Sequence, residues 1–265
     1  MQTDDTLGLS SNGFATLEQD ELDKAGFIAK PKGILTTTNL LQFNGWILSL
    51  NSHGTMALQQ KEQGKKIQPI DSAKDFRQSY IEQRARGAYI ASICQPEATF
   101  DLSVAVQHQE PVELDIVTLN KRLDWQMNNM NRGLTYVGLD LSSAKLYVFV
   151  DGSFANNKDL SSQIGFEVIL ANETTGDDEF TIHGNLIHWS STKSKRVTRS
   201  VLASEIYGMV AGTDMSFAVS STLKMITEQL DLPAIPTIVC TDSFSLYECL
   251  VKLGTTKEKR LMIDI

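Results

Sequence analysis

Hydrophobic and polar positions divide the chain into a mainly helical first part and a second part that begins with strands. Before residue 143 the pattern predicts three helices, over 71–92, 98–107 and 111–131. The last of them has an apolar stripe at helical spacing, formed by Ile116, Leu119, Leu123, Met127 and Met130. Two short apolar runs, 43–50 and 55–59, flank a turn that contains Gly54 and predict a β-hairpin.

After residue 143 the pattern changes to strands with a single long helix among them. Four apolar runs are typical of strands, over 145–150, 164–170, 185–189 and 237–241. A long helix begins near Ser200, between the third and fourth runs. Ser245 and Glu248 form a capping box for a further helix, and Thr255 and Glu258 repeat that signal. This order predicts an α/β domain with a mixed sheet.

Composition indicates an ordinary globular protein, with 42% hydrophobic and 21% charged residues among 265. The longest apolar runs, such as 146–150, are far shorter than the roughly 20 residues of a membrane-spanning helix. The N-terminus lacks a basic stretch followed by an apolar core, so no secretory signal is expected. Three cysteines cannot build a disulfide framework, which favours a reducing compartment.

Charge is unevenly distributed along the chain, whose net charge is −8. The first thirty residues hold six acids and two lysines, and we expect residues 1–34 to form an acidic, poorly ordered arm. Four positive charges lie within seven residues before the long helix, on Lys193, Lys195, Arg196 and Arg199. This stretch is either a phosphate-binding loop or a solvated basic loop, so the overall acidity does not exclude nucleic acid as a partner.

Three carboxylates interrupt apolar patterns. Asp151 and Asp242 each follow a strongly apolar strand, and Glu205 lies beside the apolar stripe of the long helix. Because chemistry in open α/β sheets gathers beyond the strand ends, we expect these three groups to converge. Converging carboxylates repel one another unless cations lie between them, and Mg²⁺ is the natural choice for an all-oxygen site. A pair of such ions is a known device for phosphodiester cleavage.

Motifs around these residues occur in an informative order. They are Val150-Asp-Gly-Ser-Phe-Ala155, Ser161-Ser-Gln-Ile-Gly165, His188-Trp-Ser-Ser-Thr-Lys193, Ser200-Val-Leu-Ala-Ser-Glu-Ile-Tyr-Gly208 and Cys240-Thr-Asp-Ser243. Together they resemble the ribonuclease H (RNase H) domain of copia-type LTR retrotransposon polyproteins, fungal members above all. Upstream, 84–92 and 100–107 are similar to the segment after the reverse transcriptase palm, and 43–70 to the last palm hairpin.

The resemblance implies an RNase H-like mixed sheet with flanking helices over 143–265. It implies a mainly helical reverse transcriptase palm-end, thumb and connection-like segment with a β-hairpin over 35–142. Asp151, Glu205 and Asp242 match the family's first three metal-binding carboxylates. The fourth lies in an Ala-Asp-x-x-Thr-Lys motif that is absent here, so we expect the domain to lack its last strand and helix. The polymerase pair Tyr-x-Asp-Asp is also absent, and no polymerase activity is expected.

Two functions follow from the resemblance as expectations. The first is a retrotransposon reverse transcriptase/RNase H fragment, from a family that cleaves the RNA strand of RNA–DNA hybrids with two Mg²⁺ ions, or Mn²⁺. Its partners would be the hybrid and other parts of the polyprotein, with no membrane. Its location would be cytoplasmic, in a virus-like particle, or nuclear, and not secreted. We expect weak or absent activity in isolation.

The alternative is a catalytically inactive remnant that binds nucleic acid or dimerises.

Overall fold

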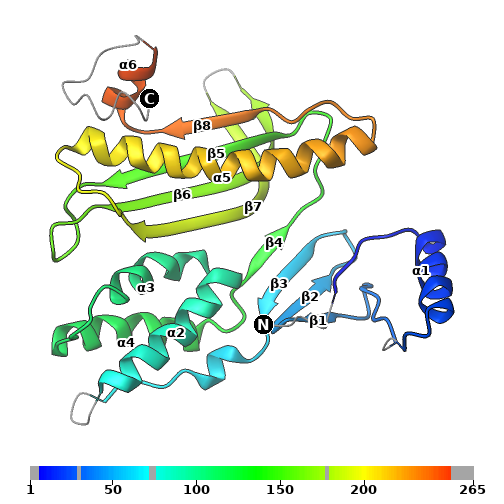
Figure 1. Cartoon of the computed structure of the whole chain (residues 1–265), viewed down its shortest axis with the longest axis horizontal. Coiled ribbons are helices and arrows are strands. Elements are labelled where there is room, and N and C mark those ends of the chain that lie inside the picture. The colour runs from blue at the N-terminus through cyan, green and yellow to red at the C-terminus, as the bar shows by residue number, and fades with distance from the viewer. Residues whose placement is uncertain (1–5, 29–30, 72–75, 177–178, 252–265) are drawn as a thin grey trace.

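A computed structural model describes residues 6–28, 31–71, 76–176 and 179–251. These residues form two four-stranded sheets, with strand orders β1-β2-β3-β4 and β7-β6-β5-β8, together with helices α1 to α6 (Figure 1). The predicted fold class, a mixed α/β sheet with flanking helices, is confirmed. Buried apolar residues form separate clusters on the two sides of residue 143. The relation of 35–142 to a reverse transcriptase stays a prediction.

The first sheet is entirely antiparallel and is larger than the predicted hairpin. Its strands are β1 (Leu41–Phe43), β2 (Trp46–Leu50), β3 (Met56–Gln60) and β4 (Leu134–Tyr136). The β2–β3 pair is the predicted hairpin. A second hairpin, β1–β2, turns through Asn44 and Gly45, which both have positive φ (46° and 84°). Asn-Gly is the strongest short hairpin signal in a sequence, so β1 could have been predicted.

Helices make up most of the rest of the first part. Their bounds are α1 (Asn12–Lys24), η1 (Gln63–Lys66), α2 (Arg77–Ile93), η2 (Pro96–Ala98), α3 (Thr99–Ala105) and α4 (Glu113–Asn128). Helix α1 has no buried residue, so the acidic arm contains a solvated helix. In α4 the predicted stripe is buried at Ile116, Leu119 and Leu123, whereas Met130 lies beyond the helix end and is exposed. Residues 72–75 of the helix predicted over 71–92 lie outside the described residues.

The second sheet contains the four strands predicted after residue 143. Its strands are β5 (Lys145–Ser153), β6 (Gln163–Thr175), β7 (Phe180–Lys193) and β8 (Thr237–Thr241). Strand β5 is antiparallel to β6 and parallel to β8. Both β6 and β7 are longer than predicted, because they pair with each other well beyond their apolar centres. Alternating residues Leu146, Val148 and Val150 of β5 face helix α5 (Val201–Gln229), which lies along one face of the sheet (Figure 1).

Helix α6 (Phe244–Val251) begins two residues earlier than its capping box predicts. The hydroxyl of Ser243, not of Ser245, accepts a hydrogen bond from the N–H of Leu246 at 3.4 Å. The prediction of Ser245 as the cap is therefore wrong. The strand ends at Thr241 and leaves room for only a two-residue turn, so the helix starts directly after Ser243. The further helix predicted from Thr255 lies outside the described residues.

Candidate metal centre

Three carboxylates meet at the carboxyl ends of β5 and β8. Each of Asp151, Glu205 and Asp242 offers an oxygen, and these oxygens all lie within 4.8 Å of one another. Asp151 lies near the end of β5, and Asp242 directly follows β8. The two strands are parallel neighbours, with Val150 paired to Thr241, so their ends coincide. Glu205 reaches the same place from the second turn of α5. The sequence-based expectation that these groups converge agrees with this geometry.

Glu205 differs from the other two in its burial. Glu205 is only 8% exposed, whereas Asp151 and Asp242 are exposed. Its Oε2 atom is buried and has no hydrogen-bond partner among the described residues. Burial raises the pKa of Glu205, and the negative charges of Asp151 and Asp242 raise it further, against an opposing backbone hydrogen bond from Gly152. A buried carboxylate oxygen without a partner is costly and calls for a positive ligand.

Close contact between α5 and β5 places Glu205 beside Asp151. A Cβ atom on Gly208 would come within 2.7 Å of the Asp151 carbonyl oxygen, so the helix backbone runs directly over the strand. The hydroxyl of Ser200 caps the helix by accepting from the N–H of Ala203 at 3.2 Å. The start of α5, and with it Glu205, is thereby fixed against the end of β5.

The donor set fits a hard divalent cation. All three groups are carboxylates, no histidine or cysteine of the described residues joins the cluster, and two of the three are open to solvent. Mg²⁺ prefers oxygen ligands and retains several of its waters, which such a half-open site allows; Mn²⁺ accepts the same donors. The partnerless Oε2 of Glu205 supplies an oxygen that the protein itself leaves unsatisfied. These residues therefore fit the ions that the sequence predicts.

The four basic residues for which the sequence leaves open a phosphate-binding or a solvated loop are all exposed. Lys193 pairs with Asp159 across the ends of the sheet. Arg196 lies over the ring of Tyr207, 5.1 Å from its centroid, two residues from Glu205 on α5. Lys195 and Arg199 lie in the loop between β7 and α5. The loop thus leads directly into α5, the helix that carries Glu205, and two of its charges are already in contact with other side chains.

A cleft of about 300 Å³ opens beside Asp151 and was not predicted. Aromatic and polar residues of the sheet and of α3 line it, among them Phe100, Phe149, Phe166, Glu167 and Trp189. The Trp189 indole N–H donates to the Thr99 hydroxyl at 3.1 Å, so this ring is engaged with the first part of the chain. Strand periodicity could have placed Phe149, Asp151 and Glu167 on one face, but nothing local links them to α3.

These features define a mixed α/β domain with a carboxylate cluster at the ends of two parallel strands. No family model and no curated protein matches the chain. Among solved structures, that of LC11-RNase H1, isolated from compost by a metagenomic approach, is similar at 19% identity and a TM-score of 0.27. The similarity covers 45% of this chain and 69% of that one, a level that says nothing of substrate or catalysis. No helix in the described ranges is long and apolar enough to cross a membrane.

Proposed function

We propose that Asp151, Glu205 and Asp242 hold divalent cations, Mg²⁺ or Mn²⁺, and that this site hydrolyses the RNA strand of RNA–DNA hybrids. The observation that carries the proposal is the buried Oε2 of Glu205, which has no partner in the described structure and lies within reach of two other carboxylates. A pair of bound cations would supply charge stabilisation for an in-line phosphodiester displacement.

Different residues of the chain would bind the cations, position Glu205 and attract the substrate. The three carboxylates hold the cations, and the fixed start of α5 keeps Glu205 in place between the two exposed aspartates. Lys195 and Arg199 attract the nucleic-acid backbone to the side of the sheet where these groups lie. The motif order and the strand order β7-β6-β5-β8 support the assignment to the RNase H type.

Calorimetric titration of Mg²⁺ and Mn²⁺ tests the metal site directly. We expect saturable binding that Glu205→Gln weakens at least tenfold, because the variant loses the buried anionic ligand. Glu167→Gln is the matched control: it removes an exposed carboxylate from β6 and leaves the cluster intact. Metal binding that is identical in the unaltered chain and in Glu205→Gln would refute the site.

Cleavage assays test the reaction. The chain is incubated with Mg²⁺ or Mn²⁺ and labelled RNA–DNA hybrid, RNA duplex or DNA duplex. We expect slow, metal-dependent cleavage of the hybrid alone, lost in Asp242→Asn and retained in Asp214→Asn, which alters an exposed residue on the outer side of α5. Activity is expected to be weak because only three carboxylates gather at the site among the described residues.

The second candidate is a catalytically inactive remnant that binds nucleic acid. The observation that favours it is that only three carboxylates gather at the site among the described residues. It predicts hybrid binding that EDTA does not change and no cleavage with either ion. Hybrid binding can be measured by fluorescence anisotropy with and without metal. Cleavage that Asp242→Asn abolishes would exclude this candidate.

We propose further that the chain belongs to a copia-type retroelement polyprotein, with 35–142 as its reverse transcriptase-derived segment. The order and spacing of the motifs over residues 35–265 support this origin. The genomic DNA on either side tests it. An in-frame Ala-Asp-x-x-Thr-Lys motif downstream and a Tyr-x-Asp-Asp motif upstream are expected. Unrelated coding sequence on both sides would contradict the retroelement origin without affecting the metal site.

A further inference from the structure

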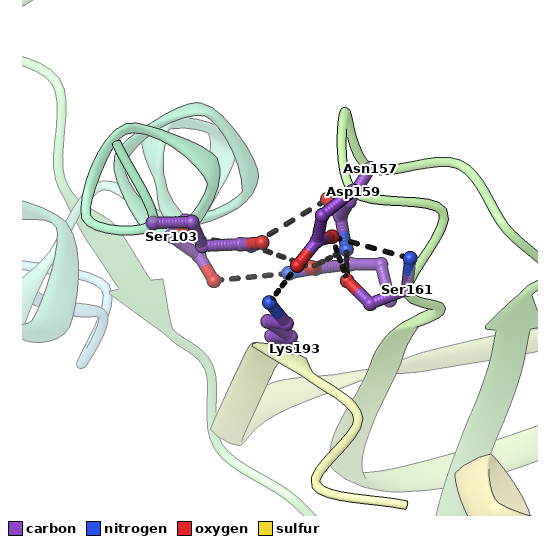
Figure 2. A network of polar contacts seen from close by, with 7 residues as sticks. Ser103, Asn157, Asp159, Ser161 and Lys193 are labelled. Carbon is purple, nitrogen blue, oxygen red and sulfur yellow. Dashed lines mark hydrogen bonds and ion pairs between the residues drawn. The ribbon is translucent and has the colours of Figure 1, made fainter. Parts of the chain in front are cut away.

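The loop between β5 and β6, residues 154–162, touches both the first part of the chain and the basic loop before α5. We name it the bridging loop. On one side, the Gln107 side-chain amide, just beyond α3, donates to Asn157 Oδ1 at 3.5 Å and to Gln163 Oε1 at 3.2 Å. Figure 2 shows this network, with Ser103 of α3 on one side and Asn157 of the loop on the other.

The two amides on the sheet side are almost fully buried. Gln163 is 3% exposed and Asn157 is 7% exposed. Gln163 donates to the hydroxyls of Ser103 (2.9 Å) and Ser191 (3.0 Å). Asn157 donates to Gln163 Oε1 (3.3 Å) and to the Ser161 hydroxyl (3.1 Å). Because buried amides without partners are costly, this network holds the loop in one arrangement relative to α3.

An ion pair adds a second link to the first part. Lys158, at the tip of the bridging loop, pairs with Asp115 near the start of α4. Asp115 is only 5% exposed and also contacts His108 Nδ1 at 3.2 Å. The Val112 N–H donates to the same carboxylate at 3.0 Å. A buried carboxylate with several donors holds its partner in a defined place.

Residues at the other end of the bridging loop contact the basic loop, residues 193–199. Asp159 pairs with Lys193, as Figure 2 shows. The Ser162 hydroxyl, in a residue 1% exposed, shares a hydrogen bond with the Thr198 hydroxyl. The Ser194 N–H donates to the Ser162 carbonyl oxygen at 2.8 Å. Three contacts therefore hold the basic loop against the bridging loop, which Gln107 and Asp115 hold from the first part of the chain.

We infer that the first part of the chain, by holding the bridging loop, determines the position of the basic loop. Gln107 is then a positioning residue for nucleic-acid binding. This inference rests on the proposed function, because it takes the basic loop to contact phosphates. Gln107 touches no candidate ligand of metal or phosphate. Its hydrogen bonds to Asn157 and Gln163 hold the bridging loop in place. The bridging loop in turn holds the basic loop, which carries Lys195 and Arg199.

Amide hydrogen exchange tests the coupling without nucleic acid. In Gln107→Ala we expect exchange over 194–199 to accelerate about fivefold, a modest change for loss of one coupled contact. The matched control is Gln83→Ala: Gln83 is likewise a glutamine of the first part, and its side-chain oxygen accepts from the Gln68 N–H at 2.8 Å, away from the bridging loop. It should leave exchange over 194–199 unchanged. Equal exchange in Gln107→Ala and the unaltered chain would overturn the inference.

A double-mutant cycle on hybrid affinity tests the positioning role. Gln107→Ala should weaken hybrid binding about fivefold in the unaltered chain, and less than twofold when Lys195 and Arg199 are already alanine. A merely structural effect of Gln107 would give the same factor in both backgrounds and would overturn the inference. Absence of hybrid binding by the unaltered chain would instead refute the proposed function, while the exchange experiment still decides the coupling.

Discussion

Gly152 of β5 and Ser204 of α5 meet backbone to backbone: a Cβ atom on Gly152 would lie 2.2 Å from the Ser204 carbonyl oxygen. The Ser204 hydroxyl strengthens the contact by donating to the Gly152 carbonyl oxygen at 2.7 Å. Asp151 precedes one partner and Glu205 follows the other. Close approach of the two elements is therefore what brings the two carboxylates together.

Gly152→Ala should force the start of α5 away from β5, because the added methyl group has only backbone atoms to displace. We expect the free energy of unfolding to fall by about 2–4 kcal/mol and Mg²⁺ affinity to fall with it. Gly165→Ala is the control, since a Cβ there would meet its nearest neighbour, the Ser190 carbonyl oxygen, at 3.8 Å. Urea unfolding compares the two variants; equal losses would contradict the role given to the Gly152 contact.

Glu205→Gln should stabilise the protein in the absence of metal. The unaltered side chain buries a carboxylate beside Asp151 and Asp242, and these neighbours together with burial raise the pKa of Glu205. Removing the charge at neutral pH relieves that cost, so we expect a gain of about 1–3 kcal/mol in urea unfolding with EDTA present.

Addition of Mg²⁺ should reverse the order of stability of these two proteins. The unaltered chain gains stability with metal concentration because the ion binds only the folded state. Glu205→Gln should gain little, and Glu167→Gln should respond like the unaltered chain. A melting temperature that rises equally in all three would show that the cations act elsewhere on the surface.

The candidate metal site could be predicted from the sequence because each carboxylate interrupts a local apolar pattern. Asp151 and Asp242 close two apolar runs typical of strands, and Glu205 lies next to the stripe of a helix. The same runs predict the four strands of the second sheet, but not which of them lie next to one another. The junction between the two parts could not be predicted, because Gln107 and Gln163 are 56 residues apart and nothing in the sequence indicates that the segments around them contact each other. The pairing of β3 with β4 could not be predicted either, because helices α2 to α4 separate the two strands along the chain.

The true cap of α6 can be identified by substitution. Ser243→Ala should destabilise the protein by about 1 kcal/mol, because the Leu246 N–H loses its acceptor at the helix start. Ser245→Ala should cost a few tenths of that, since the Ser245 hydroxyl only shares a hydrogen bond with that of Ser243 at 3.2 Å. Thermal unfolding of both variants is the measurement. A larger loss in Ser245→Ala would restore the capping box that the sequence predicts.

Asp115 should make folding stability depend on pH on the acid side. Burial alone would raise the pKa of Asp115, but hydrogen bonds from Lys158 and the Val112 N–H, with the nearby His108, outweigh it and lower the pKa below its ordinary 3.8. A lowered pKa in the folded state means that the stabilisation is present above about pH 4 and is lost as the pH falls through the folded-state value.

Asp115→Asn should therefore reduce the free energy of unfolding by about 2 kcal/mol at pH 7, the size expected for hydrogen bonds to a charged group. The difference from the unaltered chain should shrink steadily below pH 4, where the unaltered carboxyl also becomes neutral. Asp124→Asn, on the exposed side of the same helix, is the control and should show no such difference. Urea unfolding from pH 2.5 to 7 measures both. A gap between Asp115→Asn and the unaltered chain that stays constant over this range would mean that Asp115 stabilises the fold through its shape and not through its charge.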